Sequence, residues 1–317
     1  MAMRVSPVRR HSTSTFQVRP AIAADLPAVH RIWYEDEFAS EPRPPELGPV
    51  LSSFTHTLAH GELRVAEDQA GKLIGFGASI GWDGPHGSLT YLSDLFIAPD
   101  TQSHGVGQAL LRELPLSEGA RCVFASTDHR ASALYMRWGM RPLWPNYWLV
   151  ADPLWGAHGL DALPGDDIEL VEASSDGVDG LALAAWDTRH FGYARPHDLA
   201  WLLHDREAQP LWFRRAGETI GYGFVQRRSE SLWSSDVWSI GPIGAETAED
   251  ARDCVCAATR WASQRASSVR LGIPGPHPAL APLIEAGCRI VYIETFLATE
   301  GARFFDPTRY LPGGVFL

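Results

Sequence analysis

Residues 102–107 of this chain read Gln-Ser-His-Gly-Val-Gly, and this short stretch decides how we interpret the fold. An apolar run, Leu95-Phe-Ile97, precedes it, and a helical pattern from Gln108 to Leu114 follows it. Glycine has no Cβ, so Gly105 and Gly107 let the backbone turn tightly and bring its N–H groups close to a ligand. A strand, a glycine-rich turn and a helix N-terminus in this order predict a cradle for a phosphate-bearing cofactor.

Other functions of a Gly-x-Gly pair have to be weighed, since such pairs also occur in tight loops and helix caps that bind nothing. The sequence lacks the G-x-x-x-x-G-K-[ST] pattern of nucleoside triphosphate loops and the third glycine of the dinucleotide fingerprint. What remains is the pattern Q/R-x-x-G-x-G after a strand that ends in proline.

Two ordered motifs resemble the GNAT superfamily of acyl-CoA-dependent N-acyltransferases. The stretch from Tyr91 to Gly107 looks like that family's fourth strand, pyrophosphate loop and third helix. Asp128 to Tyr135, followed by Gly139, is similar to the segment in which an Asn or Asp seven residues before a tyrosine opens the helix that lines the cofactor. The resemblance implies an α/β (α+β) fold, with a mixed, mainly antiparallel sheet flanked by helices.

The order of sequence patterns occurs twice along the chain, so we expect two tandem GNAT-type domains. Gly71-Lys-Leu-Ile-Gly-Phe-Gly77 returns 146 residues later as Gly217-Glu-Thr-Ile-Gly-Tyr-Gly223. Alternating apolar residues around Gly-x-x-Ile-Gly predict an antiparallel hairpin in each copy. A repeated order at near-constant spacing indicates duplication. Two further pairs of stretches match: Ala133–Leu143 with Ala281–Val291, and Phe16–Trp33 with Ile168–Trp186.

A stretch rich in Pro and Gly separates the copies and sets the predicted boundaries. The tail after residue 300 contains aromatic residues and two prolines, so we expect it to be ordered only by packing on a domain. The predicted segments are a flexible basic arm (1–15), a catalytic GNAT domain (16–151), a linker (152–167), a degenerate GNAT-like domain (168–300) and a C-terminal tail (301–317).

The second copy lacks the residues that carry the chemistry. In place of the pyrophosphate loop it has Ile243-Gly-Ala-Glu-Thr-Ala-Glu-Asp250, which keeps one glycine and brings three carboxylates where phosphates would bind. The position that corresponds to Tyr135 is Leu283. We therefore expect a non-catalytic copy that serves as a scaffold or as one wall of the acceptor cleft.

The resemblance implies a binding site for acetyl-CoA, used as co-substrate without a metal. The main chain of Leu95, Phe96 and Ile97 would pair with the pantetheine arm, and an N–H near Leu95 or Phe96 would polarise the thioester carbonyl. Asp128 would contact pantetheine or cap the following helix, and the cap alone would explain an aspartate there. The diphosphate would lie on the loop formed by Gln102, Ser103, His104, Gly105, Val106, Gly107 and Gln108.

Tyr135 and Asp94 are the candidate catalytic residues. A phenol with a pKa near 10 can protonate a departing thiolate of pKa near 8.5 if the two are held together, so Tyr135 is the candidate acid. The alternative for Tyr135 is a core residue of an amphipathic helix. Asp94 follows Ser93 on the strand beside the reacting carbonyl and is the candidate base. It could equally be a structural hydrogen-bond acceptor, with a water relay replacing a single base.

The candidate acceptor site combines aromatic and acidic residues. By resemblance, the segment after the first helix lines it, and here this segment contains Trp33, Glu35 and Glu37. Such a patch suits an amine through charge pairing and cation–π contact, although a solvated helix end has the same composition. Trp82, with its neighbours Asp83 and His86, would extend the same wall.

Composition limits the classes of partner. A formal net charge of −11 with 21% charged residues disfavours nucleic-acid binding. No apolar run is long enough to span a membrane, and the four cysteines lack zinc-site spacing, so we expect buried thiols in a cytoplasmic protein. The acceptor partner would be a small-molecule amine, and a homodimer is compatible with the sequence.

These observations together predict an acetyl-CoA-dependent N-acetyltransferase that acts on a small amine by direct attack on the thioester. One alternative is a non-catalytic protein that binds acyl-CoA. Another is acetylation of a thiol cofactor, as in tandem family members resembling mycothiol synthase. In those proteins the C-terminal copy is the active one, and the reversed pattern here argues against that assignment.

Overall fold

The computed structural model describes residues 16–39, 41–85, 87–116, 119–152, 157–227 and 236–316. The predicted basic arm, part of the predicted linker and His86 lie outside these ranges. Within the ranges, helices and strands follow one another in the same order twice, which confirms the tandem arrangement.

The first half begins with a short strand and two helices and continues with a three-stranded meander. Its elements are β1 (Phe16–Pro20), η1 (Ala23–Asp25), α1 (Leu26–Glu37), α2 (Ser52–His60), β2 (Glu62–Asp68), β3 (Leu73–Gly84), β4 (Gly87–Ile97), η2 (Pro99–Thr101), α3 (Val106–Glu113), β5 (Ala120–Ala125), α4 (His129–Arg137) and β6 (Met140–Ala151).

The second half repeats this order and ends with an additional short strand, β13, in the tail. Its elements are η4 (Leu160–Ala162), β7 (Glu169–Glu172), α5 (Gly177–Phe191), α6 (Pro196–His204), β8 (Ala208–Arg215), β9 (Glu218–Gln226), β10 (Val237–Ala245), α7 (Ala248–Ser263), β11 (Ser268–Pro274), α8 (Leu280–Glu285), β12 (Arg289–Thr299) and β13 (Tyr310–Leu311).

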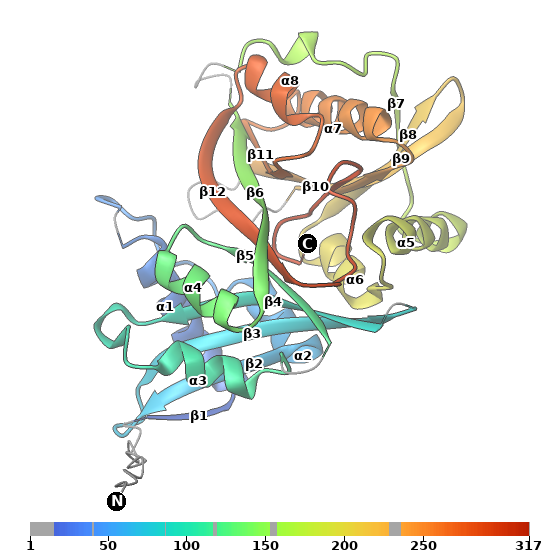
Figure 1. The fold of residues 1–317 in the computed structure, drawn as a ribbon. Helices are drawn as coiled ribbons and strands as arrows, with labels where there is room; N and C mark the ends of the chain where they lie inside the picture. Colours follow the sequence, from blue (N-terminus) through green and yellow to red (C-terminus); the bar gives the residue numbers. More distant parts are fainter. Residues whose placement is uncertain are drawn as a thin grey trace, which may run out of the picture.

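The two halves share one sheet and exchange their last long strands. The strand order is β1-β2-β3-β4-β5-β12-β6-β11-β10-β9-β8-β7, so β12 of the second half pairs with β5 of the first. In return, β6 of the first half lies between β12 and β11. Figure 1 shows β6 and β12 running side by side from one half to the other. The predicted boundary at residue 151 therefore divides the sequence, but β6 completes the sheet of the second half.

Helices cover both faces of the shared sheet. On the face that we call the α1 face, Val29 of α1 packs with Phe54 of α2 and Phe76 of β3, and Phe191 of α5 joins the aromatic core there. On the opposite α3 face, Leu111 of α3 packs against Leu92 and Val123, as does Tyr135 of α4. Helices α7 and α8 cover the second half on this side, where Val255 and Leu283 pack with Leu149 and Leu271.

The predicted linker is a packed segment in its described part. Leu160 and Leu163 are buried in the core beneath α7. Arg260 of α7 donates to the backbone oxygens of Leu163 and Gly165, at 2.7 and 2.9 Å. Residues 157–167 therefore form part of the second half rather than a free connection, which corrects the interpretation of the whole stretch 152–167 as a linker.

Helices α2 and α6 meet between the halves through buried polar contacts. Asp198 of α6 accepts a hydrogen bond from Trp82 Nε1 at 2.6 Å, and its other oxygen lies 2.7 Å from His56 Nε2 of α2. Trp201 Nε1 donates to Ser52 Oγ at 2.9 Å. These contacts hold the halves in a defined orientation, because each buried donor or acceptor has its partner in the other half.

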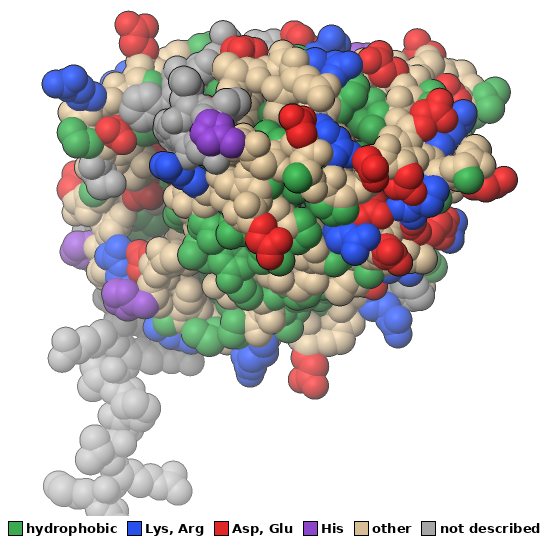
Figure 2. Space-filling model, turned by 90° about the horizontal axis from the view of Figure 1, so that it is seen from above, with side chains coloured by type: hydrophobic (Ala, Val, Ile, Leu, Met, Phe, Trp, Pro, Cys, Tyr) green, Lys and Arg blue, Asp and Glu red, His purple; other side chains and the backbone are tan. Residues whose placement is uncertain are grey.

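Charged side chains of both signs lie close together on the surface. Figure 2 shows acidic and basic groups next to one another on the face above the second half. Ion pairs join surface elements in this half, such as Arg189 with Glu246 at 2.6 Å and Arg252 with Glu249 at 3.4 Å. Exposed pairs of this kind contribute little to stability individually.

Candidate active site

Strands β4 and β5 separate at the centre of the first half. They pair in parallel from Leu89 with Ala120 to Leu92 with Val123, where the ladder ends. Opposite β3, the register shifts because Ala78 faces Asp94 and Ser79 faces Leu92, so Ser93 is the extra residue of a β-bulge. In the described part of the chain, the β5 side of residues 94–97 has no strand partner. This opening is where the sequence places the pantetheine arm.

The predicted phosphate loop has the backbone of an anion cradle. Ser103 and Gly105 both have positive φ, at +66° and +86°, and Gly105 is the N-cap of α3. A Cβ on Gly105 would meet nothing within 4 Å, so its conformation and not crowding requires glycine. The first N–H groups of α3 have no partner within the helix and carry its positive dipole end. The loop therefore fits a diphosphate.

Two side chains organise this loop from within. Gln102 Nε2 donates to the Ile97 oxygen at 3.2 Å and lies 3.4 Å from Asp36 Oδ1 of α1. The His104 Nδ1 lies 2.8 Å from the Gln102 oxygen. Helix α3 is amphipathic, with Val106, Leu110 and Leu111 buried. The loop is thus tied to the end of β4, and its exposed side remains available for a ligand.

Tyr135 of α4 lies on the α3 face, beside the opening between β4 and β5. Its side chain is 5% exposed and packs with Leu92, Val123 and Ala125. Burial raises the pKa of the Tyr135 phenol well above its usual value, and the carboxylates of Asp94 and Asp128 raise it further. The phenol therefore keeps its proton at neutral pH, as a general acid must.

Asp94 lies on the other side of the opening. Before the bulge, Tyr91 points to the α1 face, and after the bulge Asp94 does so, because Ile80 and Ala78 are their partners on β3. Burial of Asp94 raises the pKa of its carboxyl to about 6. The bulge thus brings a carboxyl with a pKa near neutrality to the face that α1 covers.

Asp128 caps helix α4. Its Oδ1 accepts a hydrogen bond from the Arg130 backbone N–H at 2.7 Å. The Arg130 guanidinium also donates to its Oδ2 at 2.7 Å and holds the pKa of Asp128 below its usual value. The sequence left two roles open for Asp128, and the structure contains one of them, the helix cap. Because the cap fixes the start of α4, it also positions Tyr135 on that helix.

The C-terminal end of α1 brings carboxyl groups to the α1 face. Burial raises the pKa of Glu37, while Arg270 of β11 opposes and Asp36 adds to the rise. The pKa of Asp36, which the sequence analysis did not select, is also raised, by burial and by Asp128. Trp33 stacks on His30 at 5.5 Å between ring centroids and is half-buried. Asp36 and Glu37 are therefore better placed than Trp33 to meet a cationic acceptor.

Two predicted acceptor residues lie elsewhere. Trp82 is 5% exposed and donates to Asp198 in the contact between the halves, so it is not available to line an open site. Glu35 lies two positions from Glu37 on α1, which places it about 200° around the helix and so on the opposite side. We remove both from the acceptor site.

Sequence analysis missed a carboxyl that comes from the second half. Glu294 of β12 accepts hydrogen bonds from Trp148 Nε1 at 2.9 Å and Asn146 Nδ2 at 3.2 Å. Burial raises its pKa to about 7, the two donors oppose the rise and Glu37 adds to it. A single acid within the apolar run Ile290-Val-Tyr-Ile-Glu-Thr-Phe-Leu297 was the available signal. The exchange of β12 makes Glu294 a neighbour of the first copy's site.

The second copy differs from the first where the catalytic strand bends. Its bulge contains Gly241 and Pro242, between the pairs Ile240–Val225 and Ile243–Gly223. Leu95 faces Gly77 in the first copy, and Gly77 corresponds to Gly223. Ile243 therefore corresponds to Leu95, and Pro242 corresponds to Asp94. Proline has neither a carboxyl nor a backbone N–H to offer a thioester.

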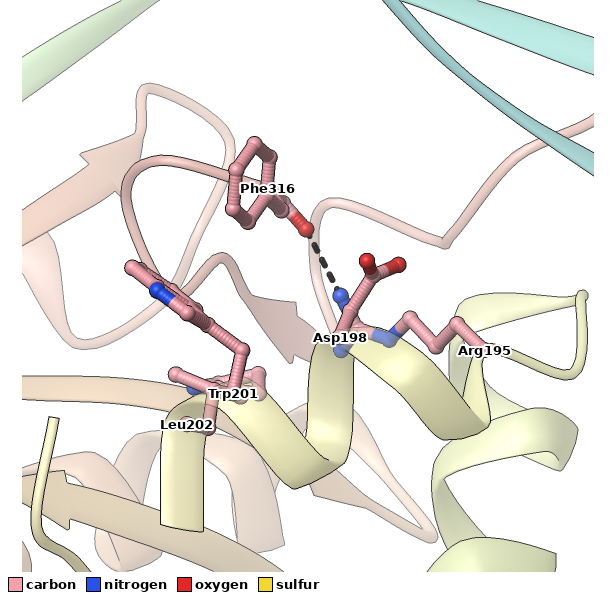
Figure 3. A pocket seen from close by; sticks show the side chains of 7 residues that line it. Arg195, Asp198, Trp201, Leu202 and Phe316 are labelled. Atoms are coloured by element: carbon pink, nitrogen blue, oxygen red, sulfur yellow. Dashed lines mark hydrogen bonds between the residues drawn. The ribbon is translucent and has the colours of Figure 1, made fainter. Parts of the chain in front are cut away.

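The protein's own tail occupies the opening in the second copy. Strand β10 pairs with β11 from Val237 to Ser239, and further along β13 pairs with β10 at Ile243 and Gly244. Gln226 Nε2 donates a hydrogen bond to the Gly313 backbone oxygen at 2.8 Å, and Arg195 Nη1 donates one to the Phe316 backbone oxygen at 2.7 Å. Figure 3 shows the Phe316 ring near Trp201 above this contact. The tail thus lies where pantetheine would bind.

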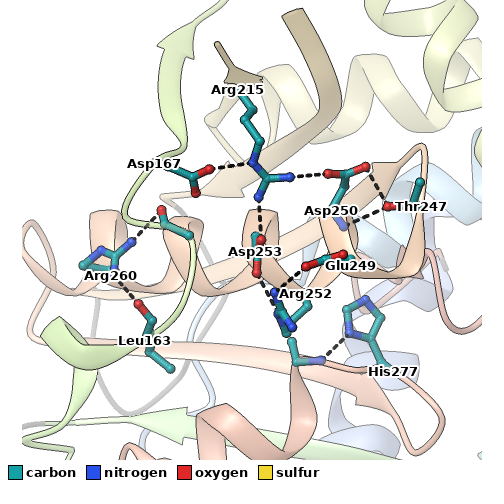
Figure 4. A network of polar contacts seen from close by, with 12 residues as sticks. Leu163, Asp167, Arg215, Thr247, Glu249, Asp250, Arg252, Asp253, Arg260 and His277 are labelled. Atoms are coloured by element: carbon teal, nitrogen blue, oxygen red, sulfur yellow. Dashed lines mark hydrogen bonds and ion pairs between the residues drawn. The ribbon is translucent and has the colours of Figure 1, made fainter.

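The stretch predicted as a degenerate phosphate loop is not a loop. Residues 243–245 belong to β10, Thr247 caps α7, and the helix begins at Ala248. The Arg215 guanidinium of β8 bridges Asp167, Asp250 and Asp253 in front of this helix end (Figure 4). Glu246 pairs with Arg189. Arginines therefore pair with these carboxylates, and the correction concerns the local structure alone, because a strand and a capped helix stand where the sequence suggested a loop.

Within the described ranges, no group of three or more His, Cys, Asp or Glu residues is arranged to hold a metal ion. Among the described helices, none combines the length and apolar character needed to cross a membrane. The four cysteines are free and buried.

Comparisons with known proteins agree with the geometry. Residues 59–141 match the family described as "Acetyltransferase (GNAT) domain", and residues 183–291 match a second family of the same description. Together the matches span more than half of the chain. The chain belongs to the GNAT acetyltransferase family. It is a two-domain GNAT acyltransferase, as the resemblance of the sequence implied.

Solved structures share the fold at low sequence identity. A Pyrococcus horikoshii protein whose description proposes an acetyltransferase is 16% identical, with a TM-score of 0.69 and 99% of each chain covered. A tandem GNAT protein from the clavulanic acid biosynthesis pathway is 14% identical, with a TM-score of 0.58, 91% of this chain and 99% of that chain covered.

A third structural neighbour is part of a larger protein. The glucosamine N-acetyltransferase region of a fungal multi-domain β-N-acetylglucosaminidase is 17% identical, with a TM-score of 0.65, 90% of this chain and 38% of that chain covered. A search of curated proteins found no match. Likeness at these identities concerns the fold.

Proposed function

We propose that the first copy transfers the acetyl group of acetyl-CoA to the amine of a small molecule. The observation that carries the proposal is the position of Tyr135 and Asp94 on opposite sides of the opening between β4 and β5. The loop from Gln102 to Gln108 lies at the end of the same strand. A cofactor site, an acid and a carboxyl base then meet where a thioester would lie.

The proposed reaction is a direct attack. The lone pair of the neutral amine attacks the thioester carbonyl carbon, and the C–S bond breaks with its electron pair on sulfur. Tyr135 gives its phenolic proton to the thiolate, and Asp94 takes the amine proton, directly or through water. A backbone N–H near Leu95 or Phe96 stabilises the negative charge on the carbonyl oxygen. The products are CoA and the N-acetylated amine.

The same observations favour a cationic acceptor and a reducing compartment for the proposed reaction. Carboxyl groups at the end of α1 and on β4 favour an acceptor that is a cation in solution. Four buried, free cysteines fit a reducing compartment, and we retain the cytoplasm as the proposed location. A thiol-cofactor acetyltransferase working from the second copy is disfavoured, because the tail pairs with β10 at its opening.

A screen of amines by release of CoA from acetyl-CoA tests this function. Tyramine, spermidine and glucosamine cover aromatic, polycationic and sugar amines, and glucosamine is the acceptor named for one structural neighbour. Amine-dependent release with at least one of them is expected. Binding of acetyl-CoA without release across the panel would favour the alternative of a non-catalytic acyl-CoA-binding protein.

The pH dependence of the reaction tests the role of Asp94. Because its carboxyl must be ionised to take a proton, kcat/KM should fall as the pH decreases through about 6. Asp94→Asn should remove this acid limb and lower turnover about 100-fold or more, the usual effect of a general base.

The same substitution should stabilise the fold at pH 8. Since the pKa of Asp94 is raised in the folded state, the ionised carboxyl opposes folding above that pKa, and Asn removes this cost. Thermal unfolding at pH 8 measures the difference in stability between the wild type and Asp94→Asn. Asp166→Asn, on an exposed residue, is the control. A wild-type pH profile retained by Asp94→Asn would exclude Asp94 as the base.

A further inference from the structure

We propose that Glu294, a residue of the second copy, binds a second cationic group of the acceptor, so that the substrate is a diamine or a similar dication. The inference rests on the proposed function and names the substrate class of the same site. Its starting point is the strand exchange, which carries β12 across the boundary between the copies and against β5.

The register of β12 places Glu294 at the edge of the opening. Thr295 faces Ala125, the last residue of β5, so Glu294 lies just beyond the end of that strand. Phe296, two residues later, packs with Phe124 and with the aromatic core that contains Tyr91. Side chains alternate along a strand, so Glu294 points to the same α1 face as Tyr91 and Asp94.

The carboxyl of Glu294 is held in place but has no cation. Trp148 and Asn146 both donate to Oε2, which fixes the orientation of the group. Among the described residues, no Lys, Arg or His side chain forms an ion pair with Glu294, which would require a nitrogen within 4.0 Å of a carboxylate oxygen. A partly buried carboxylate is costly without a partner, and its pKa is raised accordingly. A preorganised, uncompensated carboxylate is suited to a cationic ligand.

The groups around Glu294 are mainly acidic. Asp36 and Glu37 of α1 and Asp94 of β4 add carboxyls, and Arg270 of β11 adds one cation beside Glu37. Tyr91 and Tyr292 are the remaining titratable neighbours, and the pKa of each is raised by burial and by Glu294. Arg130 also lies near Asp36 but is paired with Asp128, so five carboxyls with two arginines still leave an excess of negative charge, more than one ammonium group would neutralise.

Distance along the sheet defines the substrate further. Asp94 on β4 and Glu294 on β12 lie on either side of the end of β5, and because β4 and β5 diverge there, the two carboxyls are at least two strand spacings apart, roughly 10 Å or more. If Asp94 serves the reacting amine, Glu294 is within reach of a second ammonium at the other end of a short carbon chain. The acceptor expected from this spacing carries two amino groups separated by several carbons.

A matched pair of acceptors tests the assignment. Cadaverine and 1-aminopentane have the same five-carbon chain, but only cadaverine carries the second ammonium. A charged hydrogen bond gained at Glu294 should make kcat/KM for cadaverine about 10- to 100-fold higher, mainly through KM. The KM for cadaverine should fall as the pH rises through about 7, because the carboxylate form binds the cation.

Glu294→Gln should remove the preference for cadaverine and the pH dependence of its KM, while kcat for 1-aminopentane stays the same. The amide oxygen can still accept from Trp148 and Asn146, so the fold should persist, and calorimetry with acetyl-CoA confirms it. If Glu294→Gln fails to bind acetyl-CoA, Glu294→Asp takes its place in the experiment. This variant keeps the charge and should retain the preference for cadaverine. Glu285→Gln, at an exposed site of the same half, is the control.

Three outcomes would overturn the assignment, and they differ in what else they exclude. If the wild type and Glu294→Gln prefer cadaverine over 1-aminopentane equally, Glu294 has no role in binding the second ammonium, and the proposed function is unaffected. If the wild type shows no preference for cadaverine, the role of Glu294 is likewise excluded and the proposed function is again unaffected. Hydroxylamine is largely unprotonated at neutral pH and carries no second ammonium, so a failure to acetylate hydroxylamine, both amines and the amine panel above would reject the proposed function itself.

Discussion

A chain cut after residue 160 is expected to yield no soluble, active acetyltransferase. The cut removes β12, whose Phe296 and Leu297 are fully buried against the first half. Each large apolar side chain contributes about 1.5–3 kcal/mol when buried, and domains have only about 5–15 kcal/mol of stability in total. The cut also exposes one edge of β5 and deprives β6 of both neighbouring strands. Unpaired edges of this kind favour aggregation.

Co-expression of two fragments separates loss of the second copy from damage by the cut. Residues 1–160 and 161–317, produced in one cell, should assemble, because the exchanged strands need no covalent link to pair. Solubility, acetyl-CoA binding and CoA release should return in the mixture and be missing from either fragment. A folded and fully active fragment 1–160 would show that the second copy is dispensable.

Replacement of Tyr135 by Phe is expected to lower turnover about 100- to 10,000-fold, the range found for loss of a general acid. The substitution removes one oxygen and keeps the ring that packs with Leu92 and Val123, so the fold should be unchanged. Without the phenolic proton, the thiolate must leave as an anion into a site that already contains Asp94. The effect should fall on kcat and spare the affinity for acetyl-CoA.

For Tyr135→Phe, single-turnover kinetics measures the rate of acetyl transfer, and calorimetry measures the affinity for acetyl-CoA. Tyr147→Phe is the matched control, because Tyr147 is a partly buried tyrosine on a helix-covered face but lies on β6 with the core of the second copy. It should keep kcat within about twofold, as is usual for a change outside the site. Equal rates in the two variants would assign Tyr135 to the core alone.

The local parts of the site could be predicted from the sequence. A positive φ at Gly105 and a helix starting next to it depend on a few adjacent residues, and Gly-Val-Gly before an amphipathic pattern indicates both. The cap at Asp128 is equally local. The GNAT fold and the duplication were confirmed because they depend on repeated patterns of strands and helices.

The exchange of strands could not be predicted, because the segments that lead into β6 and β12 resemble each other. Ala133–Leu143 parallels Ala281–Val291, so either strand suits either half. The position of Glu294 depends on the exchange and was missed with it. The packed stretch 157–167 and the loss of Trp82 to the interface were missed because they rest on other contacts between residues far apart in the sequence. The equivalence of Pro242 with Asp94 needed the strand register, since the two residues have no chemical similarity.

We expect one copy, the first, to bind acetyl-CoA. Isothermal titration calorimetry of the full chain with acetyl-CoA tests this expectation most directly, combined with Gly105→Val, which places a branched side chain at a φ of +86° in the loop. One site per chain is expected in the wild type and none in Gly105→Val. Two equal sites, no site, or a single site that survives in Gly105→Val would contradict it.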